Sequence, residues 1–250
     1  VQFSIKSKRQ LASHQSEIQR IDILETYEYG RVLVLDGELM ITEKDEFIYH
    51  EMITHVSMAV HPNVRDVLVI GAGDGGTIRE LVKYPFIENI DMVEVDKDVV
   101  TLCMVHMPFT ACKLQDPRVH MYFEEGLRFV RAQKAEYDLI IVDCADAYGP
   151  AEGLFTREFY GNCFKALRDD GILINQHESP FYSEHSMTVQ KAHKQIAAVF
   201  PLSMVYQCHI PSYPSGHWLF GFASKKYHPI DDLKDGYWNA LDIKTRYYNT

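Results

Sequence analysis

The chain of 250 residues has a net charge of −10, and 46% of its residues are hydrophobic. This composition is typical of a globular protein with one large domain, or one domain with a small appendage. The negative charge disfavours nucleic acid and anionic membranes as partners; it suits a cationic substrate, although solubility alone would explain it equally well. No apolar run approaches the roughly 20 residues of a membrane-spanning helix, and no charged-then-apolar leader opens the chain, so we expect a cytoplasmic protein.

The cysteines and histidines form no metal-binding pattern. The five cysteines include no close CxxC pair, which is typical of reduced cytosolic thiols. There are twelve histidines, but neither an HExxH motif nor a Cys/His ligand spacing occurs, so we expect no metal site. His185 and His193 are two helical turns apart and are expected on a solvated helix flank.

The first 50 residues have the period of β-strands. Ile18, Ile21 and Ile23 are the apolar positions of one segment. The segment RVLVLDGELMIT follows, and its Asp36-Gly37 pair is a hairpin signal. We expect residues 1–50 to form a small antiparallel β domain.

The rest of the chain alternates between helix and strand patterns. A segment of helical period runs from Glu46 to His61-Pro62, where the proline ends it. Five strand–helix units follow, and their strands are VLVIG, IDMVEVD, VHMYFEEG, YDLIIVDC and GILINQHES. Continuous apolar strands such as DLIIVD indicate a parallel sheet that is covered by helices on both faces.

Two further strands, SMVYQCHI and HWLFGFAS, are joined by the short link PSYPSG, which predicts an antiparallel pair at the sheet edge. Five βα units that end in a β-hairpin are the layout of nucleoside-methylating transferases more than of dehydrogenases. We therefore predict an α/β fold. A Rossmann-like, methyltransferase-type sheet wrapped by helices would form a catalytic domain over residues 51–250.

The stretch DVLVIGAGDGGTIREL, Asp66 to Leu81, predicts a strand, a glycine turn and a helix that hold a nucleoside-type cofactor. Its glycines, among them Gly71 and Gly73, let the backbone turn sharply and approach a ligand closely. A glycine turn alone does not separate proteins that bind NAD, FAD or S-adenosylmethionine.

Acidic residues follow the next two strands. Glu94 lies about twenty residues after the glycine turn, where an acidic side chain can accept both ribose hydroxyls. Glu125 and Gly126 close the third strand, where a carboxylate could read an adenine amino group. The alternative for both acids is that they only cap the helices that follow.

Asp74 lies inside the glycine turn, and its charge narrows the class of cofactor. A carboxylate is a poor neighbour for a pyrophosphate, so dinucleotides are disfavoured. It would repel the carboxylate of an amino-acid tail and attract a bare ammonium group. The cofactor that suits Asp74 is cationic and lacks a carboxylate.

A pair of carboxylates follows the fourth strand. Asp143 and Asp146 stand at the carboxyl end of the sheet, where the reacting groups of open α/β folds lie. An amine nucleophile must lose a proton, and a nearby carboxylate can accept it while holding the amine in line. An Asx turn at the strand end would explain one aspartate, but it is a weaker account of a pair beside Asp74.

These features resemble the spermidine synthases, the polyamine aminopropyltransferase family, over nearly the whole chain. The matching segments are SEIQ (16–19), LDGELMITEKDEFIYHEM (35–52), GAGDGG (71–76), VEVD (93–96), DCAD (143–146), GPAEGLFTREFY (149–160), YPSG (213–216) and the final RYYN. EKDEFIYHE and GPAEGLFTREFY have no counterpart in generic methyltransferases. The family transfers an aminopropyl group from decarboxylated S-adenosylmethionine to a diamine, usually putrescine, and releases 5′-methylthioadenosine.

The resemblance implies a role for each matching residue. The donor would be bound by the glycine turn with Gly126 and by five side chains: Gln19, His50, Asp74, Glu94 and Glu125. The amine side would consist of the general base Asp143 and the acceptor-binding residues Tyr49, Asp146, Glu178 and Tyr213. The resemblance also implies a small cationic diamine as partner, no prosthetic group, and a homodimer or homotetramer formed through the N-terminal sheet.

The chain departs from the family pattern at several positions. Ala72 replaces a glycine, and Cys144-Ala145 replaces a pair that usually carries a hydroxyl. His177 takes a position that is usually small or polar, so we expect an altered acceptor pocket whose depth there sets the acceptor length. The family continues past Asn249, and we therefore expect a truncated C-terminal end.

Two other functions stay open. The first is an S-adenosylmethionine-dependent methyltransferase that acts on an amine; Asp74 counts against it because that carboxylate would face the carboxylate of the cofactor. The second is a catalytically silent polyamine-binding protein, which requires that the changes at 144, 145 and 177 spoil the acceptor site. The intact Asp143 and Tyr49 count against this second function.

Overall fold

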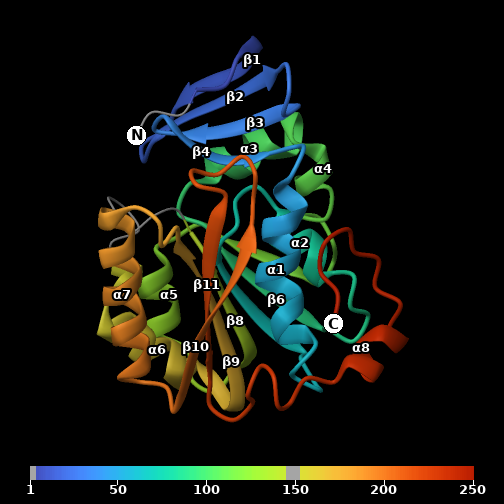
Figure 1. The fold of residues 1–250 in the computed structure, drawn as a ribbon, viewed down its shortest axis with the longest axis vertical. Helices are drawn as coiled ribbons and strands as arrows, with labels where there is room; N and C mark the ends of the chain where they lie inside the picture. Colours follow the sequence, from blue (N-terminus) through green and yellow to red (C-terminus); the bar gives the residue numbers. More distant parts are fainter. Residues whose placement is uncertain (1–3, 145–152) are drawn as a thin grey trace.

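The computed structural model describes residues 4–144 and 153–250, which form a small sheet above a larger α/β layer structure (Figure 1). The small sheet is antiparallel, and its strands pair in chain order: β1 (Ser7–Gln15), β2 (Arg20–Thr26), β3 (Arg31–Leu35) and β4 (Glu38–Thr42). Its hairpin turns at Asp36-Gly37, and both residues have positive φ (49° and 92°), as the Asp-Gly signal predicts.

The larger sheet has the order β10-β11-β9-β8-β5-β6-β7. Its strands are β5 (Asp66–Gly71), β6 (Asn89–Val93), β7 (Val119–Tyr122), β8 (Tyr137–Asp143), β9 (Leu167–Glu178), β10 (Leu202–His209) and β11 (His217–Ser224). Neighbours from β7 to β9 are parallel, and β11 is antiparallel to both β9 and β10. The predicted α/β class and the antiparallel pair at the edge are confirmed.

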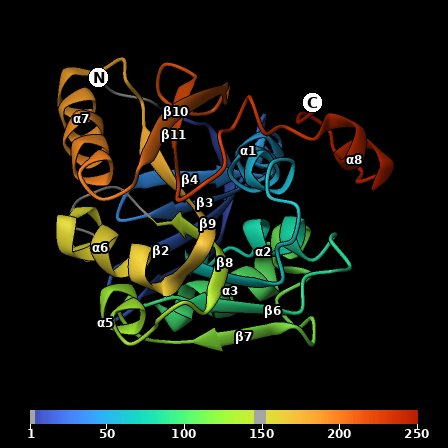
Figure 2. The same ribbon diagram turned by 90° about the horizontal axis from the view of Figure 1, so that it is seen from below.

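Helices cover both faces of this sheet (Figure 2). They are α1 (Glu46–Met58), α2 (Gly76–Leu81), α3 (Lys97–His106), α4 (Pro108–Ala111), α5 (Gly126–Arg131), α6 (Arg157–Ala166), α7 (Ser183–Ala197) and α8 (Asp235–Ala240). Alternate residues of β5 enter two different cores, since Val67 and Val69 pack with α1–α3 and Leu68 and Ile70 pack with α5–α7. This explains why the strand is apolar from Val67 to Ile70.

One boundary differs from the sequence pattern. The pattern TREFYGNCFKALRDDG predicts a helix to about residue 171, but α6 ends at Ala166 and β9 begins at Leu167. Leu167 pairs with Tyr137 of β8 and is 1% exposed. Arg168 forms ion pairs with Asp66 and Asp138, each 2.8 Å long. Strand pairing and these ion pairs override the local helix preference.

The small sheet is tied to the carboxyl end of the parallel strands. The buried carboxylate of Asp45, just before α1, accepts hydrogen bonds from Thr42 Oγ1 (2.6 Å) and from Ser212 N and Oγ (2.8 and 2.9 Å). Arg31 Nη1 donates to the carbonyl of His106 at the end of α3 (2.6 Å). These bonds place β3 and β4 over the end of the sheet at which α/β enzymes bind their ligands.

The last part of the chain is held against α1. The carboxylate of Glu51, which is buried in the middle of α1, accepts the backbone N–H groups of residues 246–248 at 2.8, 2.8 and 2.9 Å. The RYYN segment is therefore fixed by its backbone on the helix that also carries Tyr49 and His50.

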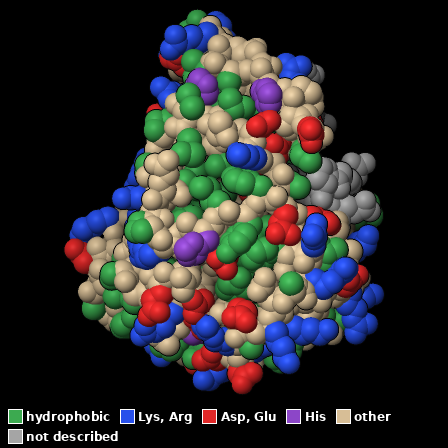
Figure 3. Space-filling model, turned by 180° about the vertical axis from the view of Figure 1, so that it is seen from behind, with side chains coloured by type: hydrophobic (Ala, Val, Ile, Leu, Met, Phe, Trp, Pro, Cys, Tyr) green, Lys and Arg blue, Asp and Glu red, His purple; other side chains and the backbone are tan. Residues whose placement is uncertain are grey.

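Two properties of the described residues concern the surface. None of their helices combines the length and the apolar character needed to cross a membrane. On the face in Figure 3, acidic and basic side chains are interspersed over the lower part, and hydrophobic side chains gather near the centre.

Candidate active site

A cavity lies between the small sheet and the carboxyl ends of β5, β6, β8 and β9. Most of the predicted site residues line it: Gln19, Tyr49, Gly71, Gly73, Asp74, Glu94, Glu125, Gly126, Asp143 and Tyr213. Its roof is apolar and comes from β3, β4 and the start of β11, with Leu33, Leu35, Leu39, Ile41 and Trp218 among its residues. Two predicted residues, His50 and Glu178, lie behind the lining, and Asp146 falls outside the described residues.

The glycine turn brings β5 and β8 close together. Gly71 has a φ of 90°, and a Cβ there would stand 2.0 Å from the carbonyl oxygen of Asp143. A Cβ at Gly73 would stand 2.9 Å from Glu94 Oε2. Only glycine fits at Gly71, and a larger residue at Gly73 would displace the Glu94 side chain, so the turn keeps Asp74, Glu94 and Asp143 on one cavity.

Ala72, the residue that replaces a family glycine, has a φ of 64°. This left-handed conformation costs an alanine roughly 1–2 kcal/mol. Glycine removes this cost, but a glycine also gives the unfolded chain more conformational entropy than an alanine does, which offsets part of the gain in stability. We therefore expect Ala72→Gly to raise the melting temperature of the ligand-free protein by about 1–4 °C. Differential scanning calorimetry measures this shift. Ala197→Gly, at an exposed helical position, should lower the melting temperature, and a lowered value for Ala72→Gly would show that Ala72 is unstrained.

Asp143 ends β8 and is 9% exposed. Its Oδ1 accepts a hydrogen bond from the Tyr49 hydroxyl (2.7 Å), and its Oδ2 accepts one from Thr77 Oγ1 (2.5 Å). Burial and the neighbouring Asp74 raise the pKa of this carboxyl, while His50 and the two hydroxyls oppose the rise. Both oxygens bond to side chains from other elements, so the residue is not merely part of an Asx turn. A buried carboxylate with a raised pKa is suited to accept a proton.

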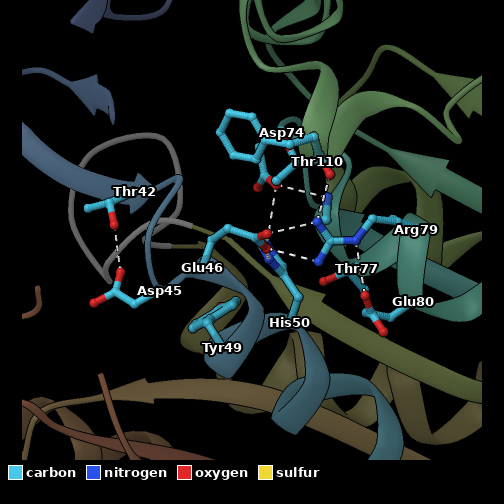
Figure 4. Close-up of polar contacts among 12 residues, drawn as sticks. Thr42, Asp45, Glu46, Tyr49, His50, Asp74, Thr77, Arg79, Glu80 and Thr110 are labelled. Atoms are coloured by element: carbon cyan, nitrogen blue, oxygen red, sulfur yellow. Dashed lines mark hydrogen bonds and ion pairs between the residues drawn. The ribbon is translucent and has the colours of Figure 1, made fainter. Parts of the chain in front are cut away.

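A buried histidine, His50, lies beside the carboxylate of Asp74 (Figure 4). His50 Nε2 lies 3.2 Å from Asp74 Oδ1, and the same oxygen accepts the backbone N–H of Gly76 at 2.8 Å. Burial opposes the charge on Asp74, but His50 and the Gly76 N–H lower the pKa of its carboxyl. The lowered pKa keeps Asp74 negatively charged at the cavity wall.

His50 is completely buried and is clamped between two carboxylates. Its Nδ1 lies 2.5 Å from Glu46 Oε2, one helical turn back on α1. Burial alone would lower the pKa of His50, but Asp74 and Glu46 raise it to about 10. A Cβ at Gly76 would stand 2.2 Å from the imidazole, which is why a glycine follows Gly75 here. The imidazole is thus a cation behind Asp74, and it does not line the cavity.

Glu46 connects this pair to a longer buried network. Arg79 of α2 donates to both oxygens of Glu46 (2.8 and 2.9 Å) and, through Nε, to Glu80 (3.0 Å). Beyond Glu80 the network continues through His55 (2.9 Å) to the Tyr84 hydroxyl, which also accepts from Trp238 of α8. Acidic and basic groups alternate along the network, so each buried charge has a partner of opposite sign.

Glu94 follows β6 and contacts the cavity. Its Oε1 accepts the backbone N–H of Asp96 at 2.9 Å, and burial raises its pKa to about 7. The helix that follows is capped by Asp96, whose Oδ1 accepts from the N–H of Asp98, so Glu94 is not its N-cap residue. Asp96 also accepts from Ser16 (2.7 Å) and from Gln19 Nε2 (3.0 Å). These bonds bring Gln19 from the small sheet to the side of Glu94.

Glu125 and Gly126 stand at the start of α5. Glu125 occupies the N-cap position but makes no side-chain capping hydrogen bond, and its exposed carboxylate borders the cavity. A Cβ at Gly126 would stand 2.5 Å from Ile70 Cγ2, so a glycine is required for the packing of α5 on β5. The helix-capping interpretation of Glu125 has no hydrogen bond to support it.

The other end of the cavity is bordered by aromatic residues and by the end of β9. The rings of Tyr49 and Tyr213 are 6.3 Å apart, and the Tyr213 ring contacts Trp218 edge-on at 4.6 Å. Gln176 of β9 reaches the cavity and donates from Nε2 to the carbonyl of Cys144 (3.2 Å). This bond joins β9 to the residue that follows Asp143.

Two expectations about histidines are wrong. His177 does not line the cavity; its ring lies 5.9 Å from that of His193 on α7, and burial together with His193 lowers its pKa to about 3. Strand alternation turns residue 177 away from the site, since Gln176 faces it. His185, expected on a solvated flank, lines the cavity, and its Nδ1 lies 3.0 Å from Glu178 Oε2.

Sequence reasoning also missed Thr77, Gln176 and Trp218. Thr77 and Gln176 are polar residues that belong to no recognisable sequence motif. Trp218 has the ordinary pattern of a strand residue, and only its place opposite Tyr213 makes it part of the site. The one available signal was the GGT sequence, which places a hydroxyl on the first turn of the helix after the glycines.

Comparisons with known proteins agree with this geometry. Residues 46–234 match the family described as "Spermine/spermidine synthase domain", and residues 1–43 match the one described as "Spermidine synthase tetramerisation domain". The chain is 79% identical to the polyamine aminopropyltransferase of Lachnoclostridium phytofermentans and 64% identical to that of Alkaliphilus oremlandii. Both alignments cover 100% of this chain and 88% of the relative.

Solved structures show the same fold. A spermidine synthase in complex with the transition-state analogue AdoDATO is 42% identical, with a TM-score of 0.95 over 98% of this chain and 83% of that one. The spermidine synthase of Thermotoga maritima is also 42% identical, with a TM-score of 0.92 over 98% and 82% of the two chains. The chain therefore belongs to the spermine/spermidine synthase family, and it is an enzyme of the polyamine aminopropyltransferase class.

Proposed function

We propose that this enzyme transfers the aminopropyl group of decarboxylated S-adenosylmethionine to a diamine, with putrescine as the first candidate acceptor. The observation that carries the proposal is the pair of carboxylates, the partly buried Asp74 and the buried Asp143, on one cavity beside the glycine turn. One carboxylate suits a cationic donor tail, and the other suits an amine that must lose a proton.

The donor assignment rests on the charge of Asp74. His50 keeps this carboxylate ionised, so an amino-acid tail with its own carboxylate would meet a like charge at close range. An aminopropyl tail without that carboxylate presents only an ammonium group. The relative that binds AdoDATO, described as a transition-state analogue, supports this assignment. The same argument disfavours a methyltransferase that uses ordinary S-adenosylmethionine.

The nucleoside would lie along the glycine turn. Glu94 and Gln19 lie side by side at the end of β6, where they can bind the ribose hydroxyls, and Glu125 borders the region expected for the base. With the nucleoside and the ammonium held at its two ends, the propyl carbon bonded to sulfur would face the acceptor side of the cavity.

The reaction is a single displacement. The lone pair of the acceptor nitrogen forms a bond to the propyl carbon, the carbon–sulfur bond breaks, and its electron pair stays on sulfur as the neutral thioether 5′-methylthioadenosine. The acceptor amine is an ammonium group in water, so Asp143 first accepts the proton whose loss frees this lone pair, and the product nitrogen keeps its two remaining protons as a secondary ammonium. Tyr49 would orient the base through its 2.7 Å hydrogen bond, and Tyr213 would flank the amine. Positioning supplies much of the rate, and the base assists.

Glu94 makes nucleoside binding dependent on pH. Its carboxyl has a pKa raised to about 7 in the empty site, and ribose hydroxyls bind the ionised form. Binding therefore lowers this pKa, and affinity should fall as the pH drops below 7. We expect the dissociation constant of 5′-methylthioadenosine to rise by up to about tenfold for each pH unit below 7 and to be constant above 8.

Isothermal titration calorimetry between pH 5.5 and 8.5 measures this dependence. Glu94→Gln should bind more weakly and with a flat profile, whereas Glu88→Gln, at an exposed position, should keep the wild-type profile. A wild-type affinity that does not change from pH 5.5 to 8.5 would show that Glu94 does not bind the ribose.

The products of the reaction test the proposed function. The enzyme is offered decarboxylated S-adenosylmethionine with putrescine, cadaverine, agmatine, norspermidine or spermidine in turn, and products are identified by mass spectrometry. We expect equal amounts of 5′-methylthioadenosine and of one amine lengthened by an aminopropyl group, with putrescine the best acceptor. The absence of any lengthened amine would refute the proposal.

We also propose that the chain assembles into a homodimer or homotetramer through the small sheet. The match of residues 1–43 to a tetramerisation domain supports this assembly. Light scattering after size-exclusion chromatography measures the mass in solution; a monomer at micromolar concentration would refute it.

A further inference from the structure

The last residue of β9, Glu178, lies behind the far end of the cavity. Glu178 has a φ of 67° and a side chain that is 1% exposed. Its backbone N–H donates to Gln176 Oε1 (2.9 Å), and Gln176 in turn donates to the carbonyl after Asp143. Glu178 follows Gln176 by two residues, and an irregularity of the strand between them places Glu178 opposite Leu219 and Gln176 opposite Phe220 of β11.

His185 separates Glu178 from the cavity. It lies on the first turn of α7, its Nδ1 is 3.0 Å from Glu178 Oε2, and its ring meets that of Tyr182 edge-on at 5.9 Å. His185 is among the residues that line the cavity, and Glu178 is not. An incoming amine therefore meets an imidazole first, and the buried carboxylate stands behind it.

The backbone around this pair is tied in place. Ser179 Oγ and Ser215 Oγ are 2.8 Å apart, which connects the segment before α7 to the loop that carries Tyr213. Phe181 N donates to the same Ser179 hydroxyl (3.2 Å). Because these bonds hold the loop, access to Glu178 depends on the side chain at 185.

We propose that His185 is a specificity-determining residue that restricts the acceptor to short diamines. A triamine carries a third ammonium group that extends beyond the space a diamine needs. A buried carboxylate binds such a cation strongly when it can reach it. The His185 imidazole occupies that place and contacts the Glu178 carboxylate itself. The third ammonium group of a triamine therefore has no room there and cannot reach the carboxylate. This inference rests on the proposed function, since it concerns the acceptor of the same reaction.

Removal of the imidazole tests the proposal. We expect His185→Ala to raise the ratio of kcat/KM for spermidine to kcat/KM for putrescine at least tenfold, with an unchanged KM for the donor. The double variant His185→Ala/Glu178→Gln should lose this gain, because the charge that holds the third ammonium is gone. His193→Ala, two turns farther along α7 and outside the cavity lining, should keep the wild-type ratio.

The outcomes separate this inference from the proposed function. If the wild-type enzyme makes spermidine but a folded His185→Ala variant keeps the acceptor ratio within twofold, the inference is wrong and the proposed function stands. If the wild-type enzyme lengthens no amine, both are wrong. His185→Gln is the second variant if alanine disturbs the fold, and calorimetry with spermidine should show tighter binding to either variant than to wild type. Equal binding to all three would also overturn the inference.

Discussion

Replacement of Asp143 by asparagine is expected to lower kcat by about 10²–10⁴-fold while the nucleoside still binds. The amide has nearly the shape of the carboxylate, but its one carbonyl oxygen can keep only one of the two hydrogen bonds that Tyr49 and Thr77 donate to Oδ1 and Oδ2. The hydroxyl that faces the amide NH2 group must turn and accept from it instead. It cannot take a proton from the acceptor nitrogen. The loss should therefore appear in the chemical step, which single-turnover measurements with putrescine report directly.

The control for this experiment is Asp91→Asn. Asp91 lies on β6, and its carboxylate accepts from the Tyr137 hydroxyl (2.7 Å) at the opposite end of the sheet from the cavity. This variant should keep the wild-type kcat. A kcat for Asp143→Asn within about threefold of wild type would exclude Asp143 as the base.

Replacement of Asp74 by asparagine should invert the preference between two donors. We expect the affinity for decarboxylated S-adenosylmethionine to fall by about 10–100-fold, which corresponds to about 1.4–2.8 kcal/mol of lost charge interaction. The affinity for ordinary S-adenosylmethionine should stay the same or rise, because the repulsion of its carboxylate is removed. Calorimetric titration of each donor, without acceptor, measures both affinities.

The inversion distinguishes charge selection from simple damage to the glycine turn. Asp74 also accepts the N–H of Gly76, a bond that an asparagine oxygen can keep. If both donors lose affinity by the same factor, the carboxylate supports the turn and does not select the donor. Asp98→Asn, which changes a half-exposed carboxylate on α3 that contacts His14 and lies outside the cavity lining, should leave both affinities unchanged.

The fold was largely predictable because its signals are local. The runs VLVIG and LIIV are apolar at every position, and the structure buries them between two helical layers. Asp36-Gly37 specified a hairpin through the positive φ that both residues adopt. The boundary between α6 and β9 at Leu167 could not be predicted from the local sequence, because it depends on the pairing of Leu167 with Tyr137, thirty positions earlier.

The cofactor side of the site was predictable for a similar reason. Gly71, Gly73 and Asp74 lie within four positions of one turn, and parallel strands have their carboxyl ends at one edge of the sheet. Glu94 and Asp143 therefore had to lie near the turn. Their positions on one cavity agree with this expectation.

The groups behind the cavity were not predictable, because they come from separate elements. Glu46 and His50 lie four residues apart on one helix, but nothing local indicates that they pair or that Arg79 of α2 completes the network. His185 was misplaced for the same reason. Its spacing from His193 describes one helix face, whereas its position depends on where β9 ends, at Glu178 with its positive φ.

The most direct test of this account is a competition between the two donors. Wild-type enzyme with putrescine receives equal concentrations of decarboxylated and ordinary S-adenosylmethionine, and mass spectrometry counts spermidine and N-methylputrescine. An ionised Asp74 beside the reacting centre predicts spermidine with no detectable methylated amine. Methylated putrescine as the main product would contradict the account.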